Sequence, residues 1–198
     1  MAETFRKRNI QEFRSRMTGG GARSNLFEVE ITFPEILRGS IDNDTVSDKI
    51  PFLVKAAEIP ASNLGNIPVP YRGRVLPIAG DRTFDPWTVT VINDTDFSIR
   101  DAMEKWSNSI NDIQTAQGRI NPEEYQTSAR VFQKSREGVG PGDPEQDLRI
   151  YKFEGIYPNV VSSIPLDFGA TDQIEEFQVT FNYLFYEVLT AGGLGIGE

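Results

Sequence analysis

The clearest pattern in the chain is a strict alternation of apolar and polar residues in several short segments. Apolar side chains first recur at every second position between residues 25 and 33, at Phe27, Val29, Ile31 and Phe33. The same period of two appears over 87–92, 148–157 and 177–185. Because successive side chains of a strand point to opposite faces of a sheet, the pattern predicts strands that each bury one face.

One segment has the period of a helix instead. Its apolar side chains fall on a single helical face, at Ile99, Ala102, Met103, Trp106 and Ile110. Ser98 and Asp101 have the spacing of a capping box, which predicts that the helix begins there. We interpret Met103 and Trp106 as core residues packed against the sheet, in preference to a binding site on this face.

A projecting hairpin is predicted between the first strand and the helix. We place its arms at 51–59 and 66–78, with Pro60, Gly65 and Asn66 in the turn and a further turn at Gly80-Asp81. Prolines alternate with apolar residues in the second arm, and a proline cannot donate a hydrogen bond to a neighbouring strand. Such a strand belongs at an edge, and an apolar edge is either protected or used for assembly. We interpret this one as used.

Two irregular segments separate the predicted elements. Segment 34–50 is interpreted as a polar loop, and its Asp42, Asp44 and Asp48 lack the glycine and distal glutamate of a calcium loop, so we interpret them as solvated acids. Segment 111–146 is interpreted as a surface insertion with a short strand pair near 124–134. Its glycine-rich string G-V-G-P-G-D-P lacks the lysine of a phosphate-binding loop.

Composition narrows the classes of function. The chain has 198 residues, 38% of them hydrophobic and 11% aromatic, which suits a single domain with a sizeable core. It has no cysteine and no histidine, so thiolate metal sites, disulfides and histidine catalysis are excluded. No cofactor, metal site or catalytic residue is predicted. The net charge of −9 argues against tight binding to a phosphate backbone.

The N-terminal segment has the opposite charge. Residues 1–24 form a basic arm that ends in three glycines, and we expect a short helix followed by a hinge. The alternative is a disordered tail. The arm is expected to contact acidic neighbouring subunits through its cations, which are Arg6, Lys7, Arg8, Arg14 and Arg16.

Together these elements predict a mainly β protein of the α+β kind. We expect an antiparallel β-sandwich or barrel with one flanking α-helix and a long protruding β-hairpin. The predicted organisation is one domain over 1–198. It comprises the basic arm (1–24), core strands with hairpin and helix (25–110), the surface insertion (111–146), C-terminal strands (147–190) and a flexible glycine-rich tail (191–198).

An ordered series of motifs adds a family resemblance. G-G-G-A-R-S-N-L-F-E-V is followed by A-E-I-P, Y-R-G-R, G-D-R-T-F, W-T-V-T-V-I-N-D and D-F-S-I-R-D-A-M-E-K-W. In this order they resemble the tail tube proteins of contractile-tailed bacteriophages and, more distantly, the Hcp-like tube proteins of contractile injection systems. With the C-terminal aromatic strand, the resemblance leaves out mainly 111–146. The topology of the predicted fold is implied by this resemblance alone.

The resemblance implies a structural virion protein, assembled in the host cytoplasm, whose hexameric rings stack into the inner tail tube and conduct DNA during ejection. Its implied partners are further copies of itself, the sheath, baseplate, tape-measure and tail-terminator proteins, and DNA in transient passage, with no membrane binding. Alternatives are an injection-system tube, a tail-completion or baseplate relative that stops at one ring, an unrelated monomeric binding module, and an enzyme that uses carboxylates, lysines or hydroxyls.

Two sets of residues are expected to serve this assembly. Contacts between rings are assigned to the hairpin residues Leu64, Ile67, Val69, Tyr71, Arg72 and Arg74, although the two arginines could instead protect an edge strand by their charge. A neutral or acidic channel wall that lets DNA slide is assigned to Glu28, Glu30, Thr88, Thr90, Gln178, Thr180 and Asn182. Ordinary solvated strand faces would have the same composition.

Overall fold

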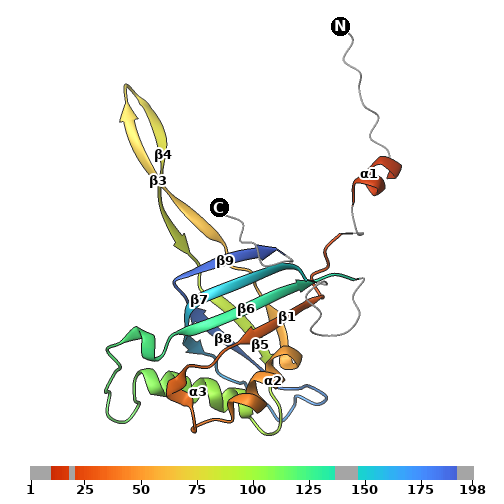
Figure 1. Cartoon of the computed structure of the whole chain (residues 1–198), viewed down its shortest axis with the longest axis vertical. Coiled ribbons are helices and arrows are strands. Elements are labelled where there is room, and N and C mark those ends of the chain that lie inside the picture. Colours follow the sequence, from red (N-terminus) through yellow and green to blue (C-terminus); the bar gives the residue numbers. More distant parts are fainter. Residues whose placement is uncertain (1–9, 18–20, 137–146, 191–198) are drawn as a thin grey trace.

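The computed structural model describes residues 10–17, 21–136 and 147–190, and this part of the chain forms nine strands and three α-helices (Figure 1). The strands are β1 (Phe27–Ile31), β2 (Val54–Ala57), β3 (Ser62–Tyr71), β4 (Arg74–Phe84), β5 (Trp87–Ile92), β6 (Thr127–Lys134), β7 (Asp147–Val161), β8 (Glu176–Asn182) and β9 (Phe185–Thr190). The helices are α1 (Ile10–Arg16), α2 (Asn43–Leu53) and α3 (Ser98–Ile110).

Seven strands form one antiparallel sheet. Its order is β1-β6-β7-β8-β5-β2, and β9 also pairs with β7. The two halves of the sheet face each other across the core, where the rings of Trp87 on β5 and Phe153 on β7 stack with centroids 4.6 Å apart. The predicted mainly β, antiparallel class is therefore confirmed. The sheet of a single subunit, however, does not close into a barrel.

Strand β7 belongs to both halves because it bends at Gly155. Before the bend it pairs with β6 and β9, and after it with β8. Gly155 has φ +67 and no partner on β6, where Thr127 opposes Ile156 and Ser128 opposes Glu154. A Cβ atom at Gly155 would lie 2.7 Å from the side chain of Leu184. Glycine permits this bulge, which directs the chain from one half of the sheet to the other.

The core is aromatic and α3 covers one side of it. Trp87, Trp106, Phe153 and Phe181 are fully buried. The buried face of α3 is the predicted one, with Ile99, Ala102, Met103 and Trp106 buried and Ile110 partly buried. The indole N–H of Trp106 donates a hydrogen bond to the carbonyl oxygen of Tyr125 at 2.9 Å. The core interpretation of this face is thus confirmed.

The structure corrects the prediction for 34–50. Much of this segment belongs to α2, which buries Val46 and Ile50. Asp42 caps the helix: its carboxylate accepts hydrogen bonds from the hydroxyl and the backbone N–H of Thr45, and these bonds lower its pKa. The helix was missed because it has few apolar positions and contains Pro51, a residue that argues against a helix interior.

Segment 111–146 is also corrected, because it is not only a surface insertion. Strand β6 lies between β1 and β7 and buries Ala129 and Val131. Residues 137–146, which include the glycine-rich string, lie outside the described residues.

Two boundaries near the C-terminus also differ from the sequence expectation. β7 continues to Val161 through Pro158, where a loop was expected. The aromatic strand expected over 177–185 is divided at Tyr183 and Leu184 into β8 and β9. Local alternation cannot reveal this division, because it persists while the pairing changes. β8 pairs with β5 and with the end of β7, whereas β9 pairs with the first part of β7.

Removal of a core ring tests this packing. We expect Phe153→Ala to lower the free energy of unfolding by about 3–5 kcal/mol, because it leaves a cavity beside Trp87. Urea denaturation of the unassembled protein measures the change. Phe168→Ala, at a fully exposed ring, is the matched control and should be close to neutral. Equal losses in the two variants would contradict the assignment of the core.

A charge cluster joins α2 to the loop before α3 and predicts a pH dependence. Lys49 Nζ lies 3.0 Å from an oxygen of Asp94 and bonds Asp96, and this lysine holds the pKa of Asp96 at about 2, below its ordinary 3.8. The pKa of Lys49 is raised above 10.5 by the same bonds. The stabilisation should therefore be complete at neutral pH and decline as the pH falls from about 4 to about 2.

A double-mutant cycle of Lys49→Met and Asp96→Asn isolates this pair. The coupling between the two substitutions, measured by thermal unfolding, should be full at pH 7 and much smaller at pH 2, where a large share of the Asp96 carboxylates is protonated. A coupling that is independent of pH would show that the contact does not act through charge.

Candidate assembly surfaces

The hairpin of β3 and β4 projects from the body as a separate two-stranded sheet (Figure 1). The chain reverses at Arg72 and Gly73, whose φ values of 46° and 80° are those of a type I′ turn. The predicted arms and turns were therefore wrong. Residues 54–57 form β2 in the main sheet, while Gly65 and Gly80 approach each other at a bulge within the hairpin.

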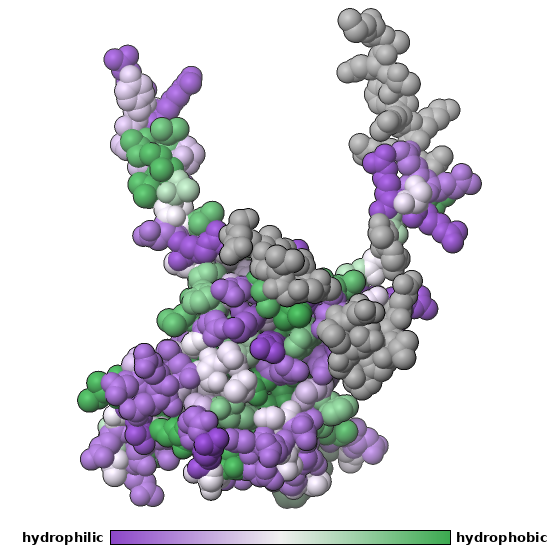
Figure 2. Space-filling view, viewed as in Figure 1, coloured by the Kyte–Doolittle hydropathy of each residue, from purple (hydrophilic) through white to green (hydrophobic). Residues whose placement is uncertain are grey.

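The hairpin presents apolar side chains on both of its faces. Cross-strand pairs on one face are Ile67 with Ile78, Val69 with Leu76, and Tyr71 with Arg74. On the other face, prolines and Val75 oppose one another. The side chains of Tyr71 and Leu76 are 66% and 60% exposed, and Figure 2 shows the hydrophobic band below the polar tip. A two-stranded hairpin has no interior, so this band can be buried only by another surface.

The sequence analysis identified the residues of this band that lie on β3 and missed those on β4. Ile67, Val69, Tyr71 and Arg74 lie together on one face, as expected for a contact surface, and Leu64 lies below the bulge. Their partners Leu76 and Ile78, and Val75 on the other face, were missed, because the second arm was predicted to run on through residues 66–78 without a turn. The pair Arg-Gly in Y-R-G-R was the available signal, since glycine favours the second position of a type I′ turn.

The tip of the hairpin is cationic. The Arg72 guanidinium lies 5.3 Å from the centroid of the Tyr71 ring. Arg72 also occupies the left-handed region, where a non-glycine residue costs about 1–2 kcal/mol. Asparagine would suit this position of the turn better. An arginine at a strained, exposed turn therefore points to a function of its side chain.

The root of the hairpin is fixed to the core. Phe84 at the end of β4 packs against Tyr183 and Tyr186, with ring centroids 5.8 and 5.6 Å away. The hydroxyl of Tyr183 donates a hydrogen bond to the carbonyl oxygen of Asp85 at 2.9 Å, and burial raises the pKa of Tyr183 to about 12. This anchor sets the direction in which the hairpin projects.

One half of the main sheet has two edges open for pairing. Strand β2 pairs with β5 only, and residues 157–161 of β7 pair with β8 only, among the strands that the structure describes. These edges bound the four-stranded half formed by β2, β5, β8 and the end of β7. An open edge has unpaired backbone groups that can accept a strand from another chain.

Five of the seven expected channel residues lie together on the outer face of this half. Thr88 opposes Thr180, with their hydroxyl oxygens 3.2 Å apart, and Thr90 opposes Gln178. Asn182, farther along β8, donates a hydrogen bond to the hydroxyl of Tyr157 at 3.3 Å. Threonine and amide side chains, which carry no charge, thus occupy neighbouring positions on this outer face.

Glu28 and Glu30 lie elsewhere, on β1 in the opposite half of the sheet. Glu28 forms an ion pair with Lys134. Glu30 stands across from Arg130, and its pKa is raised by burial despite the lowering effect of that arginine. The seven residues therefore do not share one surface, because the fold places β1 across the core from β5 and β8.

The described part of the basic arm is helix α1, which contains Arg14 and Arg16. Arg16 forms a 3.0 Å ion pair with Glu12, and no residue of α1 is buried. Ile10 and Phe13 are exposed one turn apart on this helix. Arg6, Lys7 and Arg8 lie outside the described residues.

The described part of the chain has neither a metal-binding cluster nor a membrane-spanning helix. Within 10–17, 21–136 and 147–190, no three acidic, histidine or cysteine side chains are arranged to hold a metal ion. No helix in these ranges has the length and apolar character needed to cross a membrane.

Comparison with known proteins gives consistent matches. The family model described as phage tail tube protein matches residues 22–189. The tail tube protein gp19 of Enterobacteria phage T4 is 32% identical over 174 residues, which cover 86% of this chain and 93% of the relative. The tail tube protein of Serratia phage KSP90 is 28% identical, with coverage of 88% and 93%.

Solved structures share the fold at much lower identity. A chain of the sheath/tube terminator of an extracellular contractile injection system, PVC, superposes with a TM-score of 0.59 at 10% identity, covering 86% of this chain and 97% of the other. A chain of the anti-feeding prophage baseplate gives 0.57 at 12% identity, covering 87% and 97%. These likenesses support the fold assignment alone.

Proposed function

The chain belongs to the phage tail tube protein family, and from that premise we propose that its copies form hexameric rings that stack into the inner tube of a contractile tail. The tube would be a component of the virion and the conduit for DNA ejection. The observation that supports this most directly is the hairpin, whose apolar band is exposed in a single subunit. The proposal assigns the chain a structural role and no reaction.

We prefer a tube protein of a phage tail to a tube protein of an injection system. The relatives at 28–32% identity are tail tube proteins of phages, whereas the injection-system chains are only 10–15% identical. A baseplate or tail-completion relative would form one ring and stop. The length of the polymer seen by electron microscopy distinguishes that alternative.

Ring formation is supported by the two open edges. Edge β2 of one subunit can pair with the end of β7 in its neighbour, so that six four-stranded halves form one continuous barrel. The barrel that a single chain leaves open would then be closed by its neighbours. This contact joins unlike surfaces, and such heterologous contacts close into a ring when the rotation between subunits permits.

The outer face of the four-stranded half would then line the lumen. It presents Thr88, Thr90, Gln178, Thr180 and Asn182, which are uncharged. Neutral side chains do not exchange counterions with passing phosphates, so DNA can slide along a wall that they form. Glu28 and Glu30 are not part of this proposed wall, because they lie on β1.

Contacts between rings are assigned to the hairpin. Apolar pairs along it supply the area to be buried, and Tyr71, Arg72 and Arg74 at the tip are of the residue types that dominate binding energy at interfaces. Partners outside the tube would be the sheath, baseplate, tape-measure and tail-terminator proteins. The basic arm, with Arg14 and Arg16 in α1, is proposed to contact an acidic neighbouring surface.

Substitution of Arg72 tests the contact between rings. We expect Arg72→Glu to block tube growth while the monomer stays folded, because it reverses the charge of the tip. Arg72→Asn is a sharper variant, since asparagine favours the type I′ turn and should leave the monomer at least as stable. We expect this variant to slow assembly at least tenfold, measured by light scattering and negative-stain microscopy.

Arg149→Asn serves as a control on a different strand, and tubes should form from it at the normal rate. Normal assembly of both Arg72 variants would show that the tip does not contribute to growth.

Added charge tests the lumen assignment. We expect Thr180→Lys combined with Asn182→Lys to permit tube assembly but to reduce genome delivery, because a belt of lysines in every ring would bind phosphates. Infectivity of complemented particles with tails of normal length measures the effect. Gln114→Lys combined with Gln117→Lys, at two exposed neutral residues in the loop after α3, adds the same charge outside the four-stranded half and is the control. Unchanged delivery by the Thr180 and Asn182 variant would refute the assignment.

A further inference from the structure

The loop between β7 and β8, residues 162–175, lies at the end of the main sheet remote from the hairpin. Strand β5 begins at Trp87, three residues after the hairpin ends, and runs away from it to Ile92. There Ile92 pairs with Glu176, the first residue of β8. Figure 1 shows the loop near α2, with the hairpin at the other extreme of the molecule.

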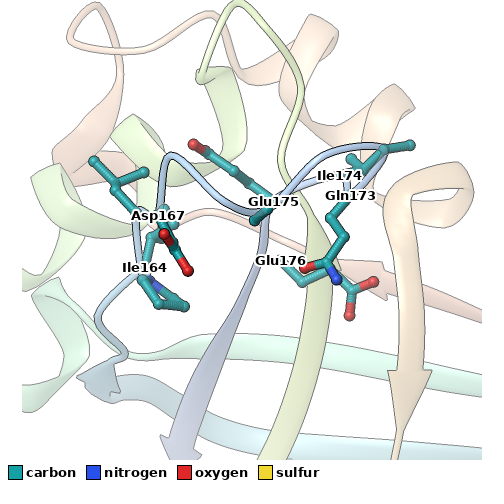
Figure 3. Close-up of a pocket in the computed structure, with 9 residues that line it drawn as sticks. Ile164, Asp167, Gln173, Ile174, Glu175 and Glu176 are labelled. Atoms are coloured by element: carbon teal, nitrogen blue, oxygen red, sulfur yellow. The ribbon is translucent and has the colours of Figure 1, made fainter.

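This loop and the start of β8 enclose a groove of about 530 Å³. Figure 3 shows Ile164 and Asp167 on one arm of the loop and Gln173, Ile174 and Glu176 on the other. Leu166 and Ile174 line the groove although they are 81% and 71% exposed. The groove therefore combines apolar side chains that are open to solvent with carboxylates.

The charge of the groove is opposite to that of the hairpin. Residues 162–176 contain four acidic residues and no basic ones, whereas residues 62–84 contain three arginines and one aspartate. Of the acids, Glu176 is partly compensated by Lys55, at 2.6 Å, and Glu175 accepts a hydrogen bond from Asn93. The carboxylate of Asp167 accepts only the neutral N–H of Gly169 among the hydrogen bonds found in the described part.

We propose that this groove receives the hairpin tip of a second copy of this chain in the adjacent ring. The proposal rests on the tube function, and it names the surface that the hairpin contacts. Tyr71, Arg72 and Arg74 would meet Asp167 and the neighbouring acids, and the apolar band below the tip would cover Leu166 and Ile174. Like-charged tips disfavour a tip-to-tip contact, so the stacking is directional.

Donor and acceptor at opposite ends of one subunit produce a particular kind of polymer. Each added ring would present a fresh set of tips at one end and a fresh set of grooves at the other. A heterologous contact of this kind does not close on itself along the axis and so permits continued growth.

Cysteine cross-linking tests the pairing directly, because the chain contains no native cysteine. We expect the double variant Arg72→Cys with Ile174→Cys, grown into tubes at a raised protein concentration that offsets the loss of the arginine, to form disulfide-linked ladders under mild oxidation. Non-reducing gel electrophoresis shows the ladders. The matched control is Arg72→Cys with Ile120→Cys, at an apolar residue that is 92% exposed but remote from the groove, and it should give no ladder. Neither variant should cross-link as dispersed subunits.

Two competing pairings are measured in the same way. Arg14→Cys with Ile174→Cys reports binding of the basic arm in the groove. Arg72→Cys with Phe52→Cys reports docking of the tip in a second acidic groove, of about 520 Å³, between β1 and α2. A ladder from either pair, with none from Arg72→Cys and Ile174→Cys, would overturn the proposal while tube formation itself stood.

A substitution at Leu166 tests the groove independently, without a cysteine in the contact. Leu166→Lys should leave a folded subunit and isolated rings, because the side chain is exposed, but should raise the concentration needed for tube growth at least tenfold, because it removes an apolar contact and repels the cationic tip. Ile120→Lys is its control and should assemble normally. Tubes of normal length from Leu166→Lys would overturn the groove assignment, whereas failure of the unmodified protein to form tubes would overturn the tube function itself.

Discussion

A two-stranded hairpin cannot bury its own side chains, and this constraint connects the parts of the structure. The band formed by Ile67, Val69, Leu76 and Ile78 faces solvent in one subunit, in a segment that pairs only with itself. Exposed apolar area of this kind is unfavourable for a lone molecule and favourable for an assembly. The open edges at β2 and the end of β7 likewise leave backbone N–H and C=O groups that another chain can pair. In the proposed tube, further copies of the chain would bury the apolar band and pair the open edges.

The rigidity of the body gives these unsatisfied surfaces a fixed geometry. Phe84 joins the hairpin root to the ring cluster of Tyr183 and Tyr186, which continues through Phe153 to Trp87 in the core. A projecting element on a flexible root would lose much of its binding energy to ordering. Here the core that stabilises the subunit also aims the hairpin, so folding and assembly depend on the same aromatic cluster.

Polarity follows from the course of β5. This strand begins near the cationic hairpin and ends beside the acidic loop 162–175, so one subunit has unlike ends. Between those ends β5 and β8 present Thr88, Thr90, Gln178 and Thr180, which are uncharged. A molecule with this distribution of charge can stack head to tail by attraction, and in the proposed tube it would present to DNA a surface with little affinity for phosphates.

The sequence by itself determined the elements whose signal is local. The alternation around Val29 and Trp87 and the helical face of Met103 and Trp106 were predicted correctly, because each element buries one face and the pattern follows from that burial. Only the tertiary structure decided what depends on distant pairing. The place of β6 within the sheet, the bend at Gly155, the return of Val75 and Leu76 along the hairpin, and the separation of Glu28 from Thr180 all follow from which strands become neighbours. Short-range periodicity is the same whichever partner a strand acquires.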